Sequence, residues 1–197
     1  MVIKLSQFIL LLSLLTLIGC DQPKATDKAF DFKSLIEKRP TSTATEIIKS
    51  SSGKSQIQIP QNWRQVHGNR TQDGHLYDIQ VAMNYGDSMI LIIEEPLIDF
   101  DPNYRLSKYT ELTLGFIKQK LKHARIHSGP FNIEIHGMRG KQHVIHGSTD
   151  GIKGVMLHTT LQGRHCFYQI LAITSPSRLE KEKEELLKIV RSFHEAV

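Results

Sequence analysis

Apolar and polar residues alternate in several segments in the way that half-buried β-strands require. Ser55–Pro60 alternates until its proline, and Ile79–Met83 repeats with the same period of two. Further apolar or alternating runs predict five more strands: Met89–Ile93, Phe131–Ile135, Lys141–His146, Val155–Leu161 and Cys166–Thr174. Short turn sequences, such as the Asp-Gly pair at residues 150–151, connect these segments. Strands joined by short turns are antiparallel neighbours.

Two segments repeat every three to four residues instead, which predicts helices. In the first, apolar residues recur from Leu106 to Ala124, and Gly129-Pro130 ends the helical region. In the second, Ser177-x-x-Glu180 matches a capping box, so we expect a helix that begins there and ends at the C-terminus. The apolar stripe of this helix consists of Leu179, Leu186, Leu187, Val190 and Phe193.

The order of these elements predicts an α+β fold with a mostly antiparallel sheet of six or seven strands. Cys166–Thr174 has apolar side chains at both odd and even positions. A strand of this kind is covered on both faces, so we expect it at the centre of the sheet. The two helices would then flank the sheet on both faces.

The first twenty residues differ from the rest and resemble a secretory signal. One cation, Lys4, precedes an apolar segment of 15 residues from Leu5 to Gly19, shorter than the roughly 20 that a spanning helix needs. The segment ends in Leu17-Ile18-Gly19-Cys20, which resembles the lipobox of bacterial lipoproteins. This resemblance implies cleavage before Cys20 and acylation of its thiol. Asp21 resembles an inner-membrane retention signal and weakly favours that membrane.

Residues 1–19 are therefore predicted to be a signal peptide, residues 20–53 a lipidated N-terminus and flexible tether, and residues 54–197 the folded domain. The tether is rich in Lys, Ser and Thr and ends in Ser50-Ser51-Ser52-Gly53. With Cys20 acylated, Cys166 has no partner for an intramolecular disulfide. Its apolar surroundings predict a buried, inert thiol.

Composition limits the class of protein. The 197 residues carry 25 Lys and Arg against 20 Asp and Glu, and 40% are apolar, as is typical of one soluble domain. The cations are spread among acids along the chain, so we expect a mixed-charge surface. An exported protein with such a surface is not expected to bind nucleic acid.

Residues 55–194 resemble the PsbP-like superfold, which includes the bacterial DcrB-type lipoproteins and the Ran-binding Mog proteins. The resemblance rests on five short motifs: Ile57-x-Ile59-Pro60-x-x-Trp63, Ile135-His136-Gly137-Met138, Thr149-Asp150-Gly151, Phe167-Tyr168-Gln169-Ile170 and Val190-Arg191-Ser192-Phe193. These motifs are turns, a strand and a helix end. The resemblance therefore implies a fold, and members that are mostly accessory or assembly proteins without a shared active site.

Histidine spacing offers the main candidate for a metal site. His143-x-x-His146 has an odd separation, so on a strand the two side chains face opposite sides and cannot chelate one ion. His136 and His158 could converge from different strands. The other interpretation places the histidines on the surface. We expect no metal and no cofactor.

The acidic and nucleophilic candidates also fail on geometry. Asp99-x-Asp101-x-Asn103 copies three positions of a calcium loop but lacks its glycine and its final glutamate, which favours a turn leading into the first helix. The adjacent carboxylates of Glu94 and Glu95 should diverge and end a strand in solvent. His165 and Cys166 should likewise face opposite ways. We expect no catalytic residue.

The sequence thus predicts a non-catalytic binding or accessory module, held on the extracytoplasmic or periplasmic face of a bacterial membrane by lipidated Cys20. Its expected partner is an extracytoplasmic or membrane protein. Two alternatives remain open: a carrier of a small molecule or metal ion, and an unrecognised hydrolase.

Overall fold

A computed structural model describes residues 44–66, 77–84 and 88–196. Two helices are present in these ranges, α2 (Leu106–Lys120) and α3 (Leu179–Arg191), with a short 3-10 turn, η3 (Leu97–Asp99), before α2. The strands are β1 (Thr45–Lys49), β2 (Ser55–Pro60), β3 (Trp63–Gln65), β4 (Ile79–Met83), β5 (Met89–Pro96), β6 (Lys122–Ile135), β7 (Met138–Thr149), β8 (Ile152–Gln162), β9 (Cys166–Thr174) and β10 (His194–Glu195).

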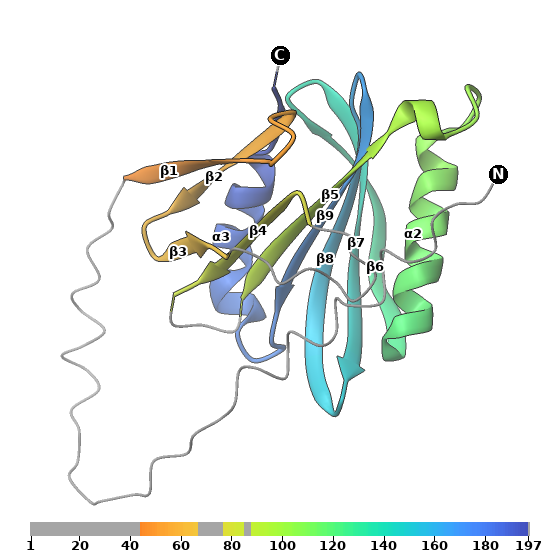
Figure 1. The fold of residues 1–197 in the computed structure, drawn as a ribbon. Coiled ribbons are helices and arrows are strands. Elements are labelled where there is room, and N and C mark those ends of the chain that lie inside the picture. Colours follow the sequence, from red (N-terminus) through yellow and green to blue (C-terminus); the bar gives the residue numbers. More distant parts are fainter. Residues whose placement is uncertain (1–43, 67–76, 85–87, 197) are drawn as a thin grey trace, which may run out of the picture.

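Seven strands form one antiparallel sheet in the order β3-β4-β5-β9-β8-β7-β6 (Figure 1). Short hairpins connect β6 to β7 and β7 to β8, as their turn sequences require. A separate three-stranded sheet has the order β1-β2-β10. The predicted α+β class and the mostly antiparallel sheet are confirmed.

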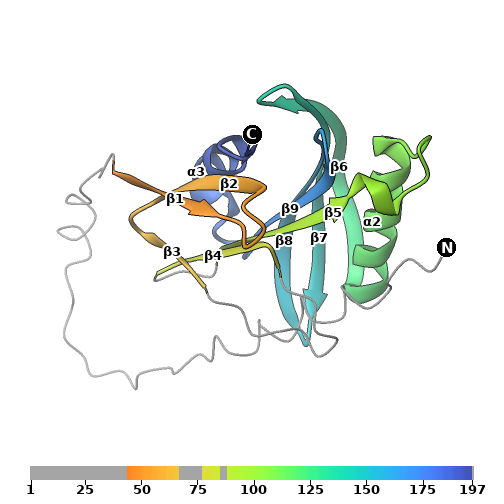
Figure 2. The same cartoon turned by 45° about the horizontal axis from the view of Figure 1, so that its top comes forward.

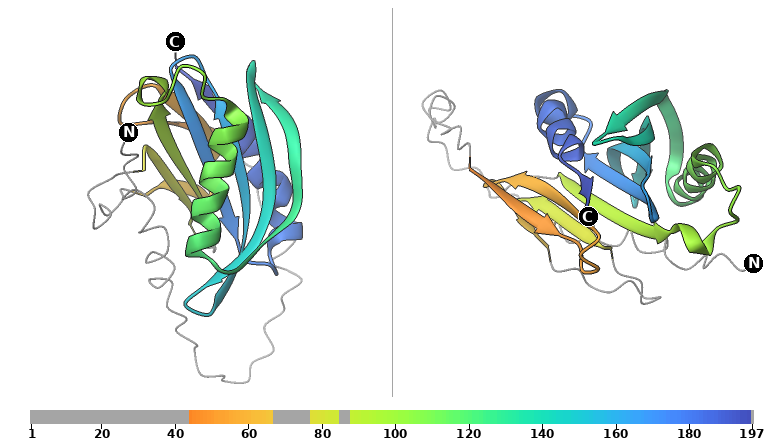
Figure 3. Two further views of the ribbon diagram at one scale, coloured as in Figure 1. Left: turned by 90° about the vertical axis from the view of Figure 1, so that its right-hand side faces the viewer. Right: turned by 90° about the horizontal axis from the view of Figure 1, so that it is seen from above.

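The two helices cover opposite faces of the seven-stranded sheet, with α2 in front of it and α3 behind it in the left view of Figure 3. All nine residues of β9 are buried. Tyr168, Ile170 and Ala172 pack in the same apolar cluster as α3, whereas Leu171 and Ile173 pack in the cluster that contains α2. The alternation of a strand therefore divides β9 between two cores, as its doubly apolar sequence predicts.

The small sheet lies beside α3, with β2 in contact with the helix (Figure 2). Ile57 and Ile59 of β2 are buried in the same cluster as Leu186 and Val190 of α3. Helix α3 contacts both β2 and β9. It thus packs on both sheets through one face, where Leu186, Ile189 and Val190 are buried, while the rest of the helix is largely exposed, as in an amphipathic surface helix.

The predicted tether is wrong for residues 45–49. They form β1, which pairs along its whole length with β2, and Ile48 is buried in the main apolar cluster. The segment has only two apolar residues, of which Ile47 remains half exposed. Its strand character comes from pairing with β2, which the local pattern could not reveal.

The predicted boundary between the first helix and the next strand is also wrong. Helix α2 ends at Lys120, and β6 begins at Lys122 and continues through Gly129-Pro130. Three register shifts interrupt its pairing with β7. Because β6 is an edge strand and exposed on both faces for most of its length, it lacks the alternation that identifies a strand.

The predicted capping box does not form. Helix α3 begins at Leu179 without a side-chain cap, and the Ser177 hydroxyl lies 3.1 Å from that of Ser175. Glu182, not Glu180, is the acid that anchors the start of α3. It is buried and bonded to Arg178 and Thr174 at 3.0 Å and to Ser88. Burial raises the pKa of Glu182, but these hydrogen bonds outweigh it and hold the pKa below its ordinary value.

The last helix does not reach the C-terminus either. It ends at Arg191, and β10 follows and pairs with β2. The Glu195 carboxylate accepts hydrogen bonds from the backbone N–H groups of Arg164 (2.9 Å) and His165 (3.2 Å) and from the Tyr168 hydroxyl (2.8 Å). The C-terminal segment therefore fastens the turn between β8 and β9 to the small sheet.

Two glycine substitutions should act in opposite directions. A Cβ at Gly140 would lie 2.7 Å from the Thr160 carbonyl oxygen and 2.5 Å from Leu161, so Gly140→Ala should lower the free energy of unfolding by about 1–3 kcal/mol. A Cβ at Gly115, inside α2, meets nothing within 4 Å, so Gly115→Ala should raise it by about 0.5–1 kcal/mol. Urea unfolding of the two variants measures both changes. Equal stabilities would contradict the close packing of β7 on β8.

Candidate functional site

A layer of polar side chains lies between α2 and the sheet. It consists of Thr110 from α2, His143 from β7, His158 and Thr160 from β8, and Gln169 from β9, and we call it the polar layer. All five are buried; His158 is 0% exposed and His143 is 4% exposed. Strand register brings them together, since His143 pairs across the sheet with His158 and Thr160 pairs with Gln169.

Hydrogen bonds connect part of this layer. The hydroxyls of Thr110 and Thr160 lie 2.7 Å apart and link α2 to β8. The Gln169 side-chain amide donates to Nε2 of His158 at 3.2 Å, which places the imidazole proton on Nδ1. No described residue pairs with Nδ1 of either His158 or His143. The two rings lie 6.1 Å apart, so the layer holds two neighbouring imidazoles that are only partly bonded.

Burial keeps both imidazoles neutral. It lowers the pKa of His158 to about 3, with a smaller contribution from nearby His143. Burial, Lys141 and Lys118 likewise lower the pKa of His143. The layer therefore opposes protonation, and acidification must destabilise the packing of α2 on the sheet.

A second cluster contacts α2 near its first turns, next to the polar layer, through Tyr109. The Tyr109 hydroxyl donates to Oε2 of Glu95 at 2.5 Å, and the Tyr109 ring stacks on Phe167 at 4.6 Å. Burial raises the pKa of Glu95, although the bond from Tyr109 opposes it, and burial beside Glu95 raises the pKa of Tyr109 well above its ordinary value. With Phe100 at an edge-on angle to both rings, this cluster has a packing role.

The histidine candidates separate as their spacing predicts. His143 faces α2 and lies beside His158, whereas His146 points to the other face and stacks on His127 at 4.7 Å. His136 lies in the turn between β6 and β7, with its ring 5.5 Å from that of His194, so it does not converge with His158. The surface interpretation is wrong for His143 and His158, because both are core residues. Within the described ranges, no three His, Cys, Asp or Glu side chains gather as a metal site would require.

The predicted turn after η3 is confirmed. Oδ1 of Asp101 accepts the backbone N–H of Asn103 at 2.8 Å, and the Asp101 carbonyl accepts that of Tyr104. An Asx turn of this kind directs the chain into α2. The carboxylate of Asp101 thus bonds its own backbone.

Glu94 and Glu95 diverge as predicted, but they do not end in solvent. Glu94 accepts hydrogen bonds from the hydroxyls of Ser52 (2.6 Å) and Ser55 (2.5 Å), on the opposite side from Tyr109. Both acids are half-buried, because the strand continues beneath the small sheet and α2.

Cys166 is free and buried, and burial raises the pKa of its thiol, as expected for an inert cysteine. The preceding His165 is exposed, so the two side chains do face opposite ways. Cys20 and Asp21 lie outside the described residues. Over the ranges that the structure does describe, no helix has the length and apolar character of a membrane span.

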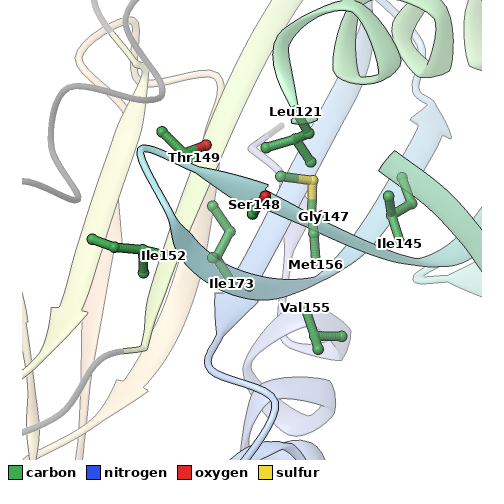
Figure 4. A pocket seen from close by; sticks show the side chains of 10 residues that line it. Leu121, Ile145, Gly147, Ser148, Thr149, Ile152, Val155, Met156 and Ile173 are labelled. Atoms are coloured by element: carbon green, nitrogen blue, oxygen red, sulfur yellow. The ribbon is translucent and has the colours of Figure 1, made fainter. Parts of the chain in front are cut away.

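Figure 4 shows a small apolar cavity where α2 ends over β7 and β8. Its volume is about 30 Å³, and it is lined chiefly by apolar residues: Leu121, Ile145, Ile152, Val155, Met156 and Ile173. A single water needs roughly 10–15 Å³, so the cavity admits one small group.

Sequence reasoning missed the polar layer. The available signal was the pair Thr110 and Thr113 within the apolar face of the first helix, together with His158, Thr159 and Thr160 inside an otherwise apolar strand. Polar residues on two predicted buried faces would have to meet each other, since buried polar groups need partners.

Comparison with known proteins identifies the architecture. No protein-family model matches the chain, and no curated protein matches it in sequence. The solution structure of PsbP (CyanoP) from the cyanobacterium Synechocystis matches with a TM-score of 0.58 and 13% identity, covering 78% of this chain and 93% of that one. The fold is PsbP-like. LpqN from Mycobacterium tuberculosis, described as involved in cell envelope biogenesis, matches with a TM-score of 0.56 and 11% identity, covering 78% of this chain and 91% of that one.

The buried histidine of the PsbP-like domain gives a test by pH. Its folded pKa of about 3 lies below the ordinary 6.5, so between these values the unfolded chain binds a proton that the folded chain does not. The unfolding free energy should fall as the pH drops through this window, by up to about 1.4 kcal/mol per pH unit. His158→Gln should remove that slope, measured by urea unfolding between about pH 6 and pH 4.

Asp78 titrates in the same window with the opposite sign, because burial raises its pKa to about 6. Asp78 is present in both the parent chain and His158→Gln. The difference between their pH slopes therefore reports His158 alone. Gln162→Ala, at an exposed position of β8, serves as the control and should keep the parent slope. An unchanged slope in His158→Gln would mean that His158 is protonated inside the fold.

Proposed function

We propose that this chain is a lipid-anchored, non-catalytic accessory module on the extracytoplasmic face of a bacterial membrane. The observation that carries the proposal is the Leu17-Ile18-Gly19-Cys20 ending of a 15-residue apolar segment. Acylation of Cys20 would supply the fatty chains, of which about two give stable anchoring. The resemblance to DcrB-type lipoproteins belongs to the same proposal.

The position of the folded domain supports this arrangement. Its first strand begins at Thr45, so the 24 residues from 21 to 44 separate Cys20 from that strand. Chain geometry limits their reach to about 80 Å. A domain held within that distance of a membrane meets partners of the same membrane at a raised effective concentration, so weak contacts suffice.

The structural neighbours support an accessory role. One is a PsbP protein and the other is described as involved in cell envelope biogenesis; neither description names an enzyme. The polar layer lies in the core beneath α2, and the cavity of about 30 Å³ admits one small group. These features favour binding through the surface of the domain. The partner we propose is an extracytoplasmic or membrane protein, and Asp21 favours the inner membrane.

Serine substitution of the two cysteines tests the anchor. Cys20→Ser should abolish incorporation of labelled palmitate and leave an uncleaved or soluble precursor, because the acylated thiol is lost. Cys166→Ser, the matched control, should keep both the label and the membrane fraction, since Cys166 is buried within the domain. Equal labelling of Cys20→Ser and the parent chain would contradict the proposal.

A further inference from the structure

Positive charge is concentrated in one part of the chain. Between Leu112 and Lys153 there are seven Lys and Arg but only two acids, Glu134 and Asp150. This excess of five equals that of the whole chain, which has 25 cations and 20 acids. The remainder is therefore balanced, and the expected mixed-charge surface does not hold for this segment.

The fold gathers five of these cations at one corner, where α2 ends and β6 and β8 begin (Figure 1). The basic corner consists of Lys118, Lys120, Lys122, Arg125 and Lys153. Lys122 is the register partner of Ser148, which is the partner of Lys153, so these two lysines share one row across the sheet. All but half-buried Lys120 are exposed, and none forms an ion pair with another described residue.

Apolar groups accompany the charges. Ile126 is 38% exposed and Ile152 is 42% exposed, and Ile152 also lines the small apolar cavity beside Leu121 (Figure 4). Leu121 itself lies between Lys120 and Lys122 in the sequence.

By register, both isoleucines lie on the α2 face of the sheet, as do Lys118 and Lys120 of α2, whereas Lys122, Arg125 and Lys153 lie on the other face. The corner therefore presents cations on both sides of the sheet edge and apolar side chains on one, a combination that suits an anionic bilayer.

We infer that the basic corner docks onto the anionic lipid headgroups of the membrane that carries the chain. This inference rests on the proposed anchoring, which brings the corner within reach of that surface. Each lysine close to an anionic bilayer strengthens binding about fivefold, so five cations hold the domain against it even through weak individual contacts.

Strand β6, the edge strand at this corner, is poorly suited to pairing with a strand of a partner protein, which is the other occupant to consider. Three register shifts interrupt β6, and Pro130 lacks a backbone donor. Bulges, proline and lysines on an edge strand oppose the addition of another strand. Charge complementarity with lipid headgroups requires no regular edge.

The test uses the full chain, purified from membranes and reconstituted into vesicles of phosphatidylcholine with or without phosphatidylglycerol. Hydrogen exchange by mass spectrometry should show slower exchange at Leu121–Ile126 and Ile152–Val155 in the anionic vesicles alone, and high salt should reverse it. The triple variant Lys118→Glu, Lys122→Glu, Lys153→Glu should lose this protection, by about fivefold or more for each lysine.

The matched control reverses three exposed lysines of α3, Lys181, Lys183 and Lys188, and should keep the protection. Thermal unfolding checks that both variants fold. Equal exchange in the two kinds of vesicle, or equal loss in the control, would overturn the inference. The same exchange measurement is made in native membranes. Slower exchange of these segments there, but not in the anionic vesicles, would assign the basic corner to a protein partner and also overturn the inference. Palmitate labelling of the same sample separates failure of the anchor from failure of the docking surface.

Discussion

The structure depends on the burial of β9 on both faces. Of the strands in the described ranges, β9 alone has every residue buried, and it pairs with β5 on one side and β8 on the other. Its alternate side chains enter two separate apolar clusters, one completed by α3 and the other by α2. Each large side chain buried in this way contributes about 1.5–3 kcal/mol, so the helices are required on both faces.

The two faces of the seven-stranded sheet differ in the side chains that they bury. The face covered by α3 carries the larger apolar cluster, to which the small sheet contributes Ile57 and Ile59, and a buried hydrogen-bonded group of Ser88, Thr174 and Glu182. The face covered by α2 includes the polar layer, where His158 and His143 remain neutral because they are buried. Helix α2 is therefore attached by directional hydrogen bonds as well as apolar contacts, and its attachment should respond to pH.

Sequence patterns predicted the elements whose structure depends on nearby residues alone. The bounds of β9 and the turn after η3 follow from the residues alone, since a doubly apolar strand and an Asx turn have local signatures. The sequence did not predict the extent of the edge strand β6, because a strand that is exposed on both faces has no apolar alternation. It did not predict β1 either, because β1 is a strand through its pairing with β2. The polar layer required knowledge of register, which joins His143 to His158 across two strands.

The function that we propose uses the surface of the fold and the segment that precedes it. Crosslinking in native membranes followed by mass spectrometry tests this claim most directly. The account predicts that the domain crosslinks reproducibly to a protein of the same membrane, that Cys20→Ser loses these crosslinks and that Cys166→Ser keeps them. Crosslinks that persist unchanged in Cys20→Ser, or a parent chain that crosslinks to no protein, would contradict it.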